Sequence, residues 1–200
     1  MMHALPGMGA NRRMYPPPWS SLPDFIAQNW PPYAGEKSLT DIALSTSEAL
    51  HIRDGDSLIG SSLGGMVACE ITKIRKIKTL WLVGSATRME DISVLLSMLH
   101  PLAQIAPIDW LRFSAGKIPG ELTEMFAEAE TPFLRTMCLA IFEWKGLHGS
   151  TTKIFRIHGR NDLVIPPPSN VDLLLEGGHI ISMTHAKQCV EFIGSTSRFD

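Results

Sequence analysis

Short apolar runs alternate with longer segments of helical periodicity along the chain. The runs predict strands at Met2–Leu5, Asp24–Gln28, Ser57–Ile59, Thr79–Val83, Lys153–Ile157 and Val171–Leu175. This alternation is typical of an α/β domain with a mainly parallel sheet flanked by helices. Each strand is followed by a loop that contains Gly, Pro, Asn or Asp, and in a doubly wound sheet such loops meet at the ligand site. We therefore expect the chemistry at the carboxyl ends of the strands.

The pattern changes between Arg88 and Gly149, where helical periodicity rich in Met, Leu, Phe and Trp is interrupted by four prolines. This change predicts a helical insertion at residues 88–149, within a core made of residues 1–87 and 150–200. Thr131–Phe142 is predicted as one of its helices, with Thr131 as the cap and Pro132 at the first helical position. One face of that helix must be buried.

Composition narrows the class of protein. The chain has 200 residues, 44% of them hydrophobic, and a net charge of -2, which fits one globular domain. Lys and Arg (18) nearly balance Asp and Glu (20), so we expect no nucleic acid and no anionic membrane as partner. There is no signal-peptide pattern and no run of about 18 apolar residues. Cys69, Cys138 and Cys189 have apolar neighbours, as buried thiols do, and we expect a cytoplasmic protein without a membrane span.

The strongest chemical signal is the segment from Gly60 to Gly64, which reads Gly-Ser-Ser-Leu-Gly between a strand and a helix. A sharp strand-to-helix turn holds a serine hydroxyl away from its own backbone, and this makes Ser62 a candidate nucleophile. At Gly60 and Gly64 a Cβ would collide with neighbouring backbone.

A serine nucleophile needs a base, and imidazole suits that role. His179 follows the last predicted strand and is our choice among seven histidines; His158, directly after another strand, is the reserve. Asp162 lies in the loop after the predicted strand Lys153–Ile157 and could orient the base, although an Asn-Asp pair there is also an ordinary turn. The order Ser62, Asp162, His179 is that of one fold in particular.

An oxyanion hole completes such a site. One donor would be the Leu63 amide, at the start of a helix where unpaired N–H groups favour negative charge. The second would be the Met8 amide in the loop Leu5–Gly9, which reads Leu-Pro-Gly-Met-Gly. An ordinary tight turn is the alternative interpretation of that loop.

Together these segments resemble the α/β-hydrolase superfamily over nearly the whole chain. Residues 60–66 resemble its nucleophile elbow, 5–9 its oxyanion loop, 158–162 its acid loop and 177–179 its base loop. The resemblance implies a helical lid at residues 88–149, and Glu124–Gly146 resembles a group of bacterial hydrolases without assigned substrates. The first two antiparallel strands of the family are missing, so the resemblance implies about six strands. The loop reads Leu-Pro-Gly where many relatives have His-Gly, which leaves the second donor less securely assigned.

We therefore expect a serine hydrolase that cleaves a carboxylic ester or thioester of a small-molecule substrate through an acyl-enzyme, with no metal or organic cofactor. Apolar lid residues would either line a pocket for the acyl group or form the lid core; they are Trp110, Phe113, Met125, Phe126 and Met137. Two alternatives stay open. One is C–C bond hydrolysis or cofactor-free lyase chemistry, for which Arg12 and Arg13 are the only suggestive pair; the other is a ligand-binding protein without turnover.

Overall fold

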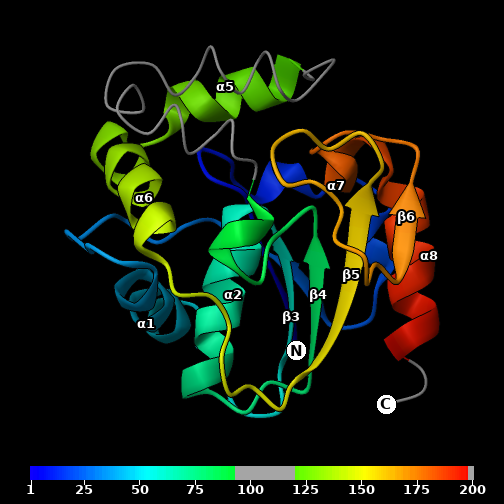
Figure 1. Cartoon of the computed structure of the whole chain (residues 1–200), viewed down its shortest axis with the longest axis horizontal. Coiled ribbons are helices and arrows are strands. Elements are labelled where there is room, and N and C mark those ends of the chain that lie inside the picture. The colour runs from blue at the N-terminus through cyan, green and yellow to red at the C-terminus, as the bar shows by residue number, and fades with distance from the viewer. Residues whose placement is uncertain (93–119, 198–200) are drawn as a thin grey trace.

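Six parallel strands form one sheet at the centre of the protein (Figure 1). The computed structural model describes residues 1–92 and 120–197. The strands are β1 (Met2–Leu5), β2 (Phe25–Ala27), β3 (Ser57–Ser61), β4 (Thr79–Val83), β5 (Lys153–Gly159) and β6 (Leu173–Leu175). Their order is β2-β1-β3-β4-β5-β6, and each neighbouring pair in that order is parallel. The predicted six-stranded, mainly parallel sheet is confirmed.

Several strand ends differ from the prediction. Strand β6 begins at Leu173 rather than Val171, because the Asp172 carboxylate accepts the Arg156 amide at 2.7 Å. Strands β3 and β5 continue two residues further than predicted, to Ser61 and Gly159, and both of these residues still pair with a neighbouring strand. The carboxyl ends of the strands are therefore extended toward the predicted site.

Helices cover both faces of the sheet. Helices α1 (Leu39–Ala49) and α2 (Leu63–Ile74) lie on one face, and α8 (Ala186–Thr196) lies on the other, preceded by the short α7 (Ile181–Thr184) (Figure 1). The described residues also contain three 3-10 turns: η1 (Arg12–Met14), η2 (Trp19–Ser21) and η3 (Met89–Asp91). Helix α2 is buried without interruption from Leu63 to Ile71, which fits a helix packed between the sheet and α1.

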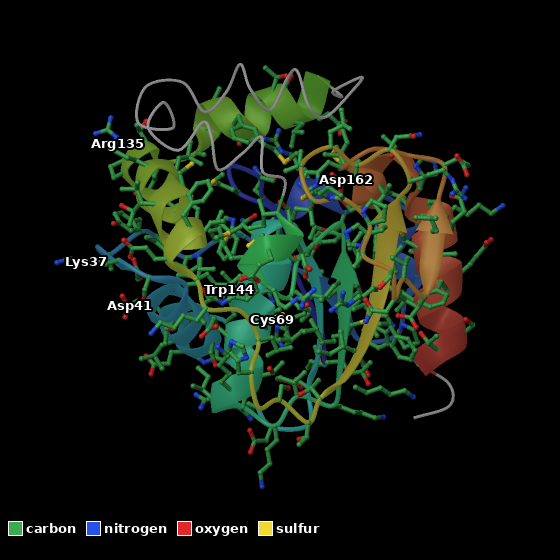
Figure 2. All side chains as sticks on the ribbon, in the orientation of Figure 1. Lys37, Asp41, Cys69, Arg135, Trp144 and Asp162 are labelled. Atoms are coloured by element: carbon green, nitrogen blue, oxygen red, sulfur yellow. The ribbon has the colours of Figure 1, made fainter. Side chains whose placement is uncertain are left out.

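The side chains divide between interior and surface as the apolar pattern requires. Cys69 and Trp144 lie inside the protein, whereas Lys37, Asp41 and Arg135 lie at its outer edge (Figure 2). Asp41 closes the first turn of α1 in a capping box with Ser38, an arrangement that satisfies two otherwise unpaired amides. Cys69, Cys138 and Cys189 are free and buried, as predicted.

The described part of the insertion contains two helices, α5 (Gly120–Glu128) and α6 (Thr131–Glu143). Helix α5 lies beyond the carboxyl ends of the strands, at the top of Figure 1. Helix α6 begins one residue earlier than predicted: Glu130 is its N-cap, and Thr131 is inside the helix and does not cap it. Proline is tolerated throughout the first turn, where amides have no partner within the helix, so Pro132 does not fix the start. Trp110 and Phe113 lie outside the described residues.

Within residues 1–92 and 120–197, no helix is long and apolar enough to cross a membrane.

Candidate active site

Ser62 lies at the turn between β3 and α2 with φ 51° and ψ -121°. Positive φ is unusual for any residue with a Cβ and costs roughly 1–3 kcal/mol. Two contacts from the end of β4 hold this backbone in place: the Ser62 amide donates to the Val83 carbonyl at 3.3 Å, and Ser85 Oγ donates to the Ser62 carbonyl at 2.7 Å. The strained turn is thus fixed by the neighbouring strand.

The two glycines around Ser62 are required by close backbone contacts. A Cβ on Gly60 would lie 2.4 Å from Gly65 Cα, and a Cβ on Gly64 would lie 2.3 Å from the Leu5 carbonyl oxygen. Both distances are far below van der Waals contact. A Cβ at either position would therefore collide with backbone, as expected from the sequence. The two glycines allow α2 to lie directly against β1 and β3.

The structure brings Ser62, His179 and Asp162 into one hydrogen-bonded line. His179 Nε2 lies 2.9 Å from Ser62 Oγ, and His179 Nδ1 lies 2.8 Å from Asp162 Oδ2. A carboxylate can only accept, so Nδ1 carries the proton and Nε2 is left to accept from the serine. This geometry is that of a nucleophile, a base and an orienting acid.

Asp162 is held independently of His179. Its Oδ1 accepts hydrogen bonds from the Val164 and Ile165 amides, each at 2.9 Å. The side chains of Asp162 and His179 are only 0% and 4% exposed. Two backbone donors and burial therefore fix the carboxylate. The turn expected as the alternative for Asn161-Asp162 also forms, because Oδ1 bonds the backbone while Oδ2 faces His179.

Comparison with solved structures gives the fold. An esterase from Exiguobacterium antarcticum superposes with a TM-score of 0.74 at 17% identity, over 98% of this chain and 91% of that one. A hydrolase from Oleispira antarctica superposes with a TM-score of 0.74 at 17% identity, over 96% of this chain and 90% of that one. The chain has the α/β-hydrolase fold. An N-acyl homoserine lactonase complexed with N-butanoyl homoserine gives 0.73 at 15% identity, over 99% and 87%. No protein-family model matches the sequence, and no protein of curated function is significantly similar to it.

Neither His158 nor His185 hydrogen-bonds to Ser62 among the described residues. His158, the reserve base, is fully buried, and neither ring nitrogen has a hydrogen-bond partner among the described residues. Burial, more than any nearby charge, lowers the pKa of His158 to about 4. His185 bonds the Thr184 hydroxyl at 2.8 Å. Within the described ranges, no group of three His, Cys, Asp or Glu side chains is placed to hold a metal ion.

The two expected oxyanion donors belong to segments that lie next to Ser62. Leu63 is the first residue of α2, where an amide has no acceptor within the helix. Met8 follows Gly7, and a Cβ placed on Gly7 would lie 3.5 Å from Ser62 Cβ. The loop after β1 is therefore in contact with the nucleophile. The donor role of both amides stays a prediction.

Helices α5 and α6 pack on the loop after β1. The Phe126 ring fills the space next to Gly9, where a Cβ would lie 2.3 Å from the ring. Met125 Sδ accepts a hydrogen bond from the Asn11 amide at 3.4 Å, and Cys138 Sγ lies 3.6 Å from Met8 Sδ. Phe126, Met125 and Met137 are buried. The described insertion helices thus contact the loop that carries the proposed second donor.

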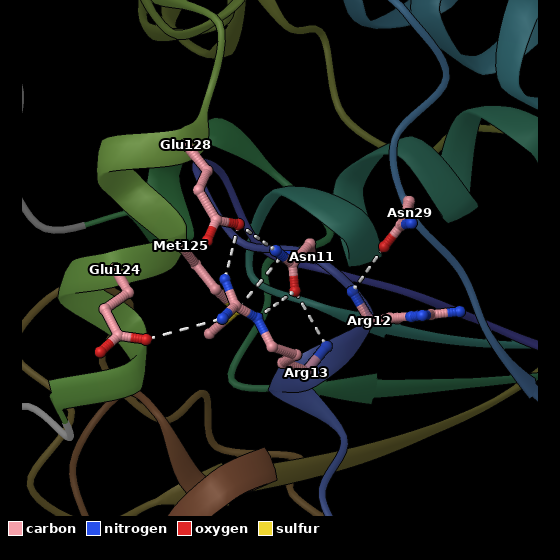
Figure 3. A network of polar contacts seen from close by, with 7 residues as sticks. All are labelled: Asn11, Arg12, Arg13, Asn29, Glu124, Met125 and Glu128. Carbon is pink, nitrogen blue, oxygen red and sulfur yellow. Dashed lines mark hydrogen bonds and ion pairs between the residues drawn. The ribbon is translucent and has the colours of Figure 1, made fainter.

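A polar network at the surface joins α5 to η1 (Figure 3). Arg13 pairs with Glu128 at 2.6 Å and with Glu124 at 3.6 Å, and Asn11 Nδ2 donates to Glu128 at 3.2 Å. Arg12 donates its amide to Asn29 Oδ1 at 3.0 Å, while its side chain points away from the network. Arg13 is therefore engaged in holding α5.

Three residues near the site were not identified from the sequence. Tyr15 Oη lies 2.6 Å from the Leu5 carbonyl and 3.0 Å from Ser61 Oγ, which joins the ends of β1 and β3. Ser85 fixes the Ser62 carbonyl, and Trp30 Nε1 donates to the Gly7 carbonyl at 3.0 Å. Ser85 had a usable signal, since it follows a strand. Tyr15 and Trp30 had none, because their partners are backbone carbonyls distant in the sequence.

Proposed function

We propose that the protein is a serine hydrolase that cleaves a carboxylic ester or thioester through an acyl-enzyme intermediate. The observation that carries the proposal is the line of hydrogen bonds from Ser62 through His179 to Asp162. The burial of the acid and base and the strained backbone of Ser62 add support, since both are features of an activated nucleophile.

In the first half of the reaction, Ser62 Oγ attacks the carbonyl carbon while its proton passes to His179 Nε2. Asp162 keeps the imidazole in the correct tautomer and stabilises the imidazolium. His179 then returns the proton to the departing alcohol or thiol, and the acyl group stays on Ser62. In the second half, His179 takes a proton from water, the hydroxide attacks the acyl-enzyme, and Ser62 regains its proton as the acid leaves.

The negative charge on the carbonyl oxygen would be stabilised by the Leu63 and Met8 amides. Leu63 adds the partial positive charge of the α2 N-terminus. Met8 is adjacent to Gly7, which contacts Ser62. Two backbone donors that converge on one carbonyl oxygen are the usual arrangement for stabilising a tetrahedral intermediate.

We propose a small apolar acyl group as the reacting part of the substrate. The described insertion helices present apolar side chains toward the loop after β1, among them Phe126 and Met125. Met side chains adapt to irregular hydrophobic shapes. The esterases and the lactonase that share the fold are named for ester bonds, and this also favours an ester substrate.

The test combines a fluorophosphonate probe with turnover of chromogenic esters of increasing acyl length. We expect the wild-type protein to be labelled at Ser62 and to hydrolyse the shorter esters. Ser62→Ala should lose the label and lower kcat by up to about 10⁶. Ser195→Ala is the matched control, because Ser195 is an exposed serine on α8 whose hydroxyl bonds the Phe192 carbonyl, and it should keep both label and turnover.

Three results would contradict the proposal in different ways. Turnover retained in Ser62→Ala would show another nucleophile. Thermal stabilisation by an ester in both proteins, without product, would favour a ligand-binding protein. Ser62-dependent cleavage of a C–C bond in preference to any ester would favour the lyase-like alternative.

A further inference from the structure

The peptide group that joins Gly7 to Met8 begins at a residue next to Ser62. Gly7 follows β1 by two residues, and a Cβ placed on it would lie 3.5 Å from Ser62 Cβ. This peptide contains two polar groups, the Gly7 carbonyl and the Met8 amide. Its orientation therefore decides which of the two faces the reacting atoms.

Most amides of this loop are already used. Gly7 N–H donates to Met14 Sδ at 3.2 Å, Ala10 N–H donates to the Gly7 carbonyl at 3.2 Å, and Asn11 N–H donates to Met125 Sδ at 3.4 Å. In the described part of the chain, the Met8 amide has no hydrogen-bond partner. Met8 is half-buried, so its free amide next to Ser62 is available to a substrate.

Trp30 fixes the orientation of that peptide together with the Ala10 amide, which donates to the same carbonyl. Its indole Nε1–H donates to the Gly7 carbonyl at 3.0 Å. Among the described residues the only cis peptide bond is Pro17-Pro18, so the Gly7–Met8 peptide is trans. In a trans peptide the C=O and N–H groups point in opposite directions. A carbonyl held toward Trp30 thus turns the Met8 N–H away from Trp30.

Trp30 is itself held by the insertion. Its ring centroid lies 5.4 Å from that of Phe133, a buried residue of α6, and the two rings are tilted by 46°; aromatic rings at this separation attract each other. The indole is therefore fixed by a ring contact with α6 and by its hydrogen bond to Gly7. It connects the insertion to the loop beside Ser62.

We propose that Trp30 is a positioning residue for the oxyanion hole: by holding the Gly7 carbonyl, it aims the Met8 amide at the charge that develops beside Ser62. This inference rests on the proposed function. It identifies what sets the direction of the second donor, which the Leu-Pro-Gly sequence of the loop leaves undefined.

The test compares an aryl ester with the corresponding thionoester in the Trp30→Phe variant, which keeps an aromatic ring and removes the indole donor. Sulfur is a weak hydrogen-bond acceptor, so a thionoester gains little from the oxyanion hole. Loss of one oxyanion donor lowers kcat by about 10²–10³, and a donor that is only misdirected should cost about tenfold or more. We expect kcat for the ester to fall by that factor with KM nearly unchanged, while kcat for the thionoester stays close to wild type.

Trp81→Phe is the matched control. Trp81 Nε1 also donates a hydrogen bond, to Thr196 Oγ1 at 3.0 Å, but Trp81 borders a hollow at the opposite end of the sheet with Met1 and Met2. The Trp81→Phe variant should leave the ratio of kcat for the ester to kcat for the thionoester unchanged. An equal fall for both substrates in Trp30→Phe, or no fall for either, would overturn the positioning role. Absence of any Ser62-dependent turnover in the wild-type protein would instead overturn the proposed function itself, and the positioning role with it.

Discussion

Asp162 uses its two carboxylate oxygens for different tasks. Oδ2 faces His179, and Oδ1 accepts two backbone amides. Because an amide side chain also has one accepting oxygen, asparagine can keep the backbone contacts at this position. Its NH2 group would then face His179 Nδ1 and force that nitrogen to accept, which places the ring proton on the wrong nitrogen.

Asp162→Asn should therefore lower kcat by about 10⁴ without unfolding the protein. The measurement is ester turnover together with urea unfolding. Asp172→Asn is the control, since Asp172 also accepts a backbone amide but lies exposed at the start of β6; it should change kcat little. A loss of kcat in Asp162→Asn that merely follows a loss of folded protein would contradict the assigned role.

At the scale of elements, a buried carboxylate joins the segment after α6 to the core. Glu70 on α2 is 4% exposed. It accepts hydrogen bonds from Trp144 Nε1 at 2.7 Å and from Thr40 Oγ1 at 3.0 Å, and it pairs with Lys73. One side chain thus connects α1, α2 and the chain between α6 and β5.

Removing that carboxylate should weaken the connection. In Glu70→Ala the Trp144 indole N–H stays buried without an acceptor, and such a group costs about 1–3 kcal/mol. Glu70→Gln keeps an oxygen for Trp144 and places an NH2 group opposite the Thr40 hydroxyl, which can accept from it. The charge that pairs with the partly exposed Lys73 is lost, at a cost of under about 1 kcal/mol. Urea unfolding of the two variants should separate these values. Equal destabilisation would mean that charge, and not the indole hydrogen bond, dominates.

The sequence predicted those elements whose signal is local. The apolar run before Gly60 and the helical pattern after Gly64 place β3 and α2, and the strained turn between them follows from the glycines. The start of β6 was predicted two residues too early, because the Asp172 carboxylate accepts a hydrogen bond from the Arg156 amide of the neighbouring strand β5. Such a contact joins residues far apart in the chain, and no periodicity reports it.

The same distinction holds for the site. Ser62, Asp162 and His179 each follow a strand, so a parallel sheet brings them to one edge. Trp30 and Tyr15 act on the backbone carbonyls of Gly7 and Leu5, which every residue possesses and which carry no sequence signal. Contacts of this kind become visible only in three dimensions.

At the scale of the whole molecule, His158 makes stability depend on pH. Its pKa in the folded protein is lowered to about 4, mainly by burial, from 6.5; Asp162, His179, Arg156 and Asp91 contribute smaller effects. The unfolded chain therefore binds a proton at a pH where the folded chain does not. Stability from this residue is complete above pH 6.5 and is lost as the pH falls from 6.5 toward 4.

Between pH 7 and pH 5 this loss should be about 2 kcal/mol. Urea unfolding at the two pH values should show that the free energy of unfolding of the wild-type protein is lower at pH 5. In His158→Gln this decrease should be smaller by about 2 kcal/mol. His148→Gln, at an exposed histidine, should behave as wild type. The comparison is between the two pH values within each protein, so a general destabilisation by His158→Gln does not affect it. Identical drops in all three proteins would contradict the role of His158.

The proposed triad is assembled from both ends of the chain. Ser62 and His179 are 117 residues apart in the sequence, yet they share a hydrogen bond. Synthesis on the ribosome proceeds from the N-terminus, so β1 to β4 and the nucleophile emerge long before β5, β6 and the base. A nascent chain holding the elbow alone has a serine without a proton acceptor. In the proposed mechanism, acylation of Ser62 has to wait until the last strand has joined the sheet, so translation itself would delay the onset of chemistry.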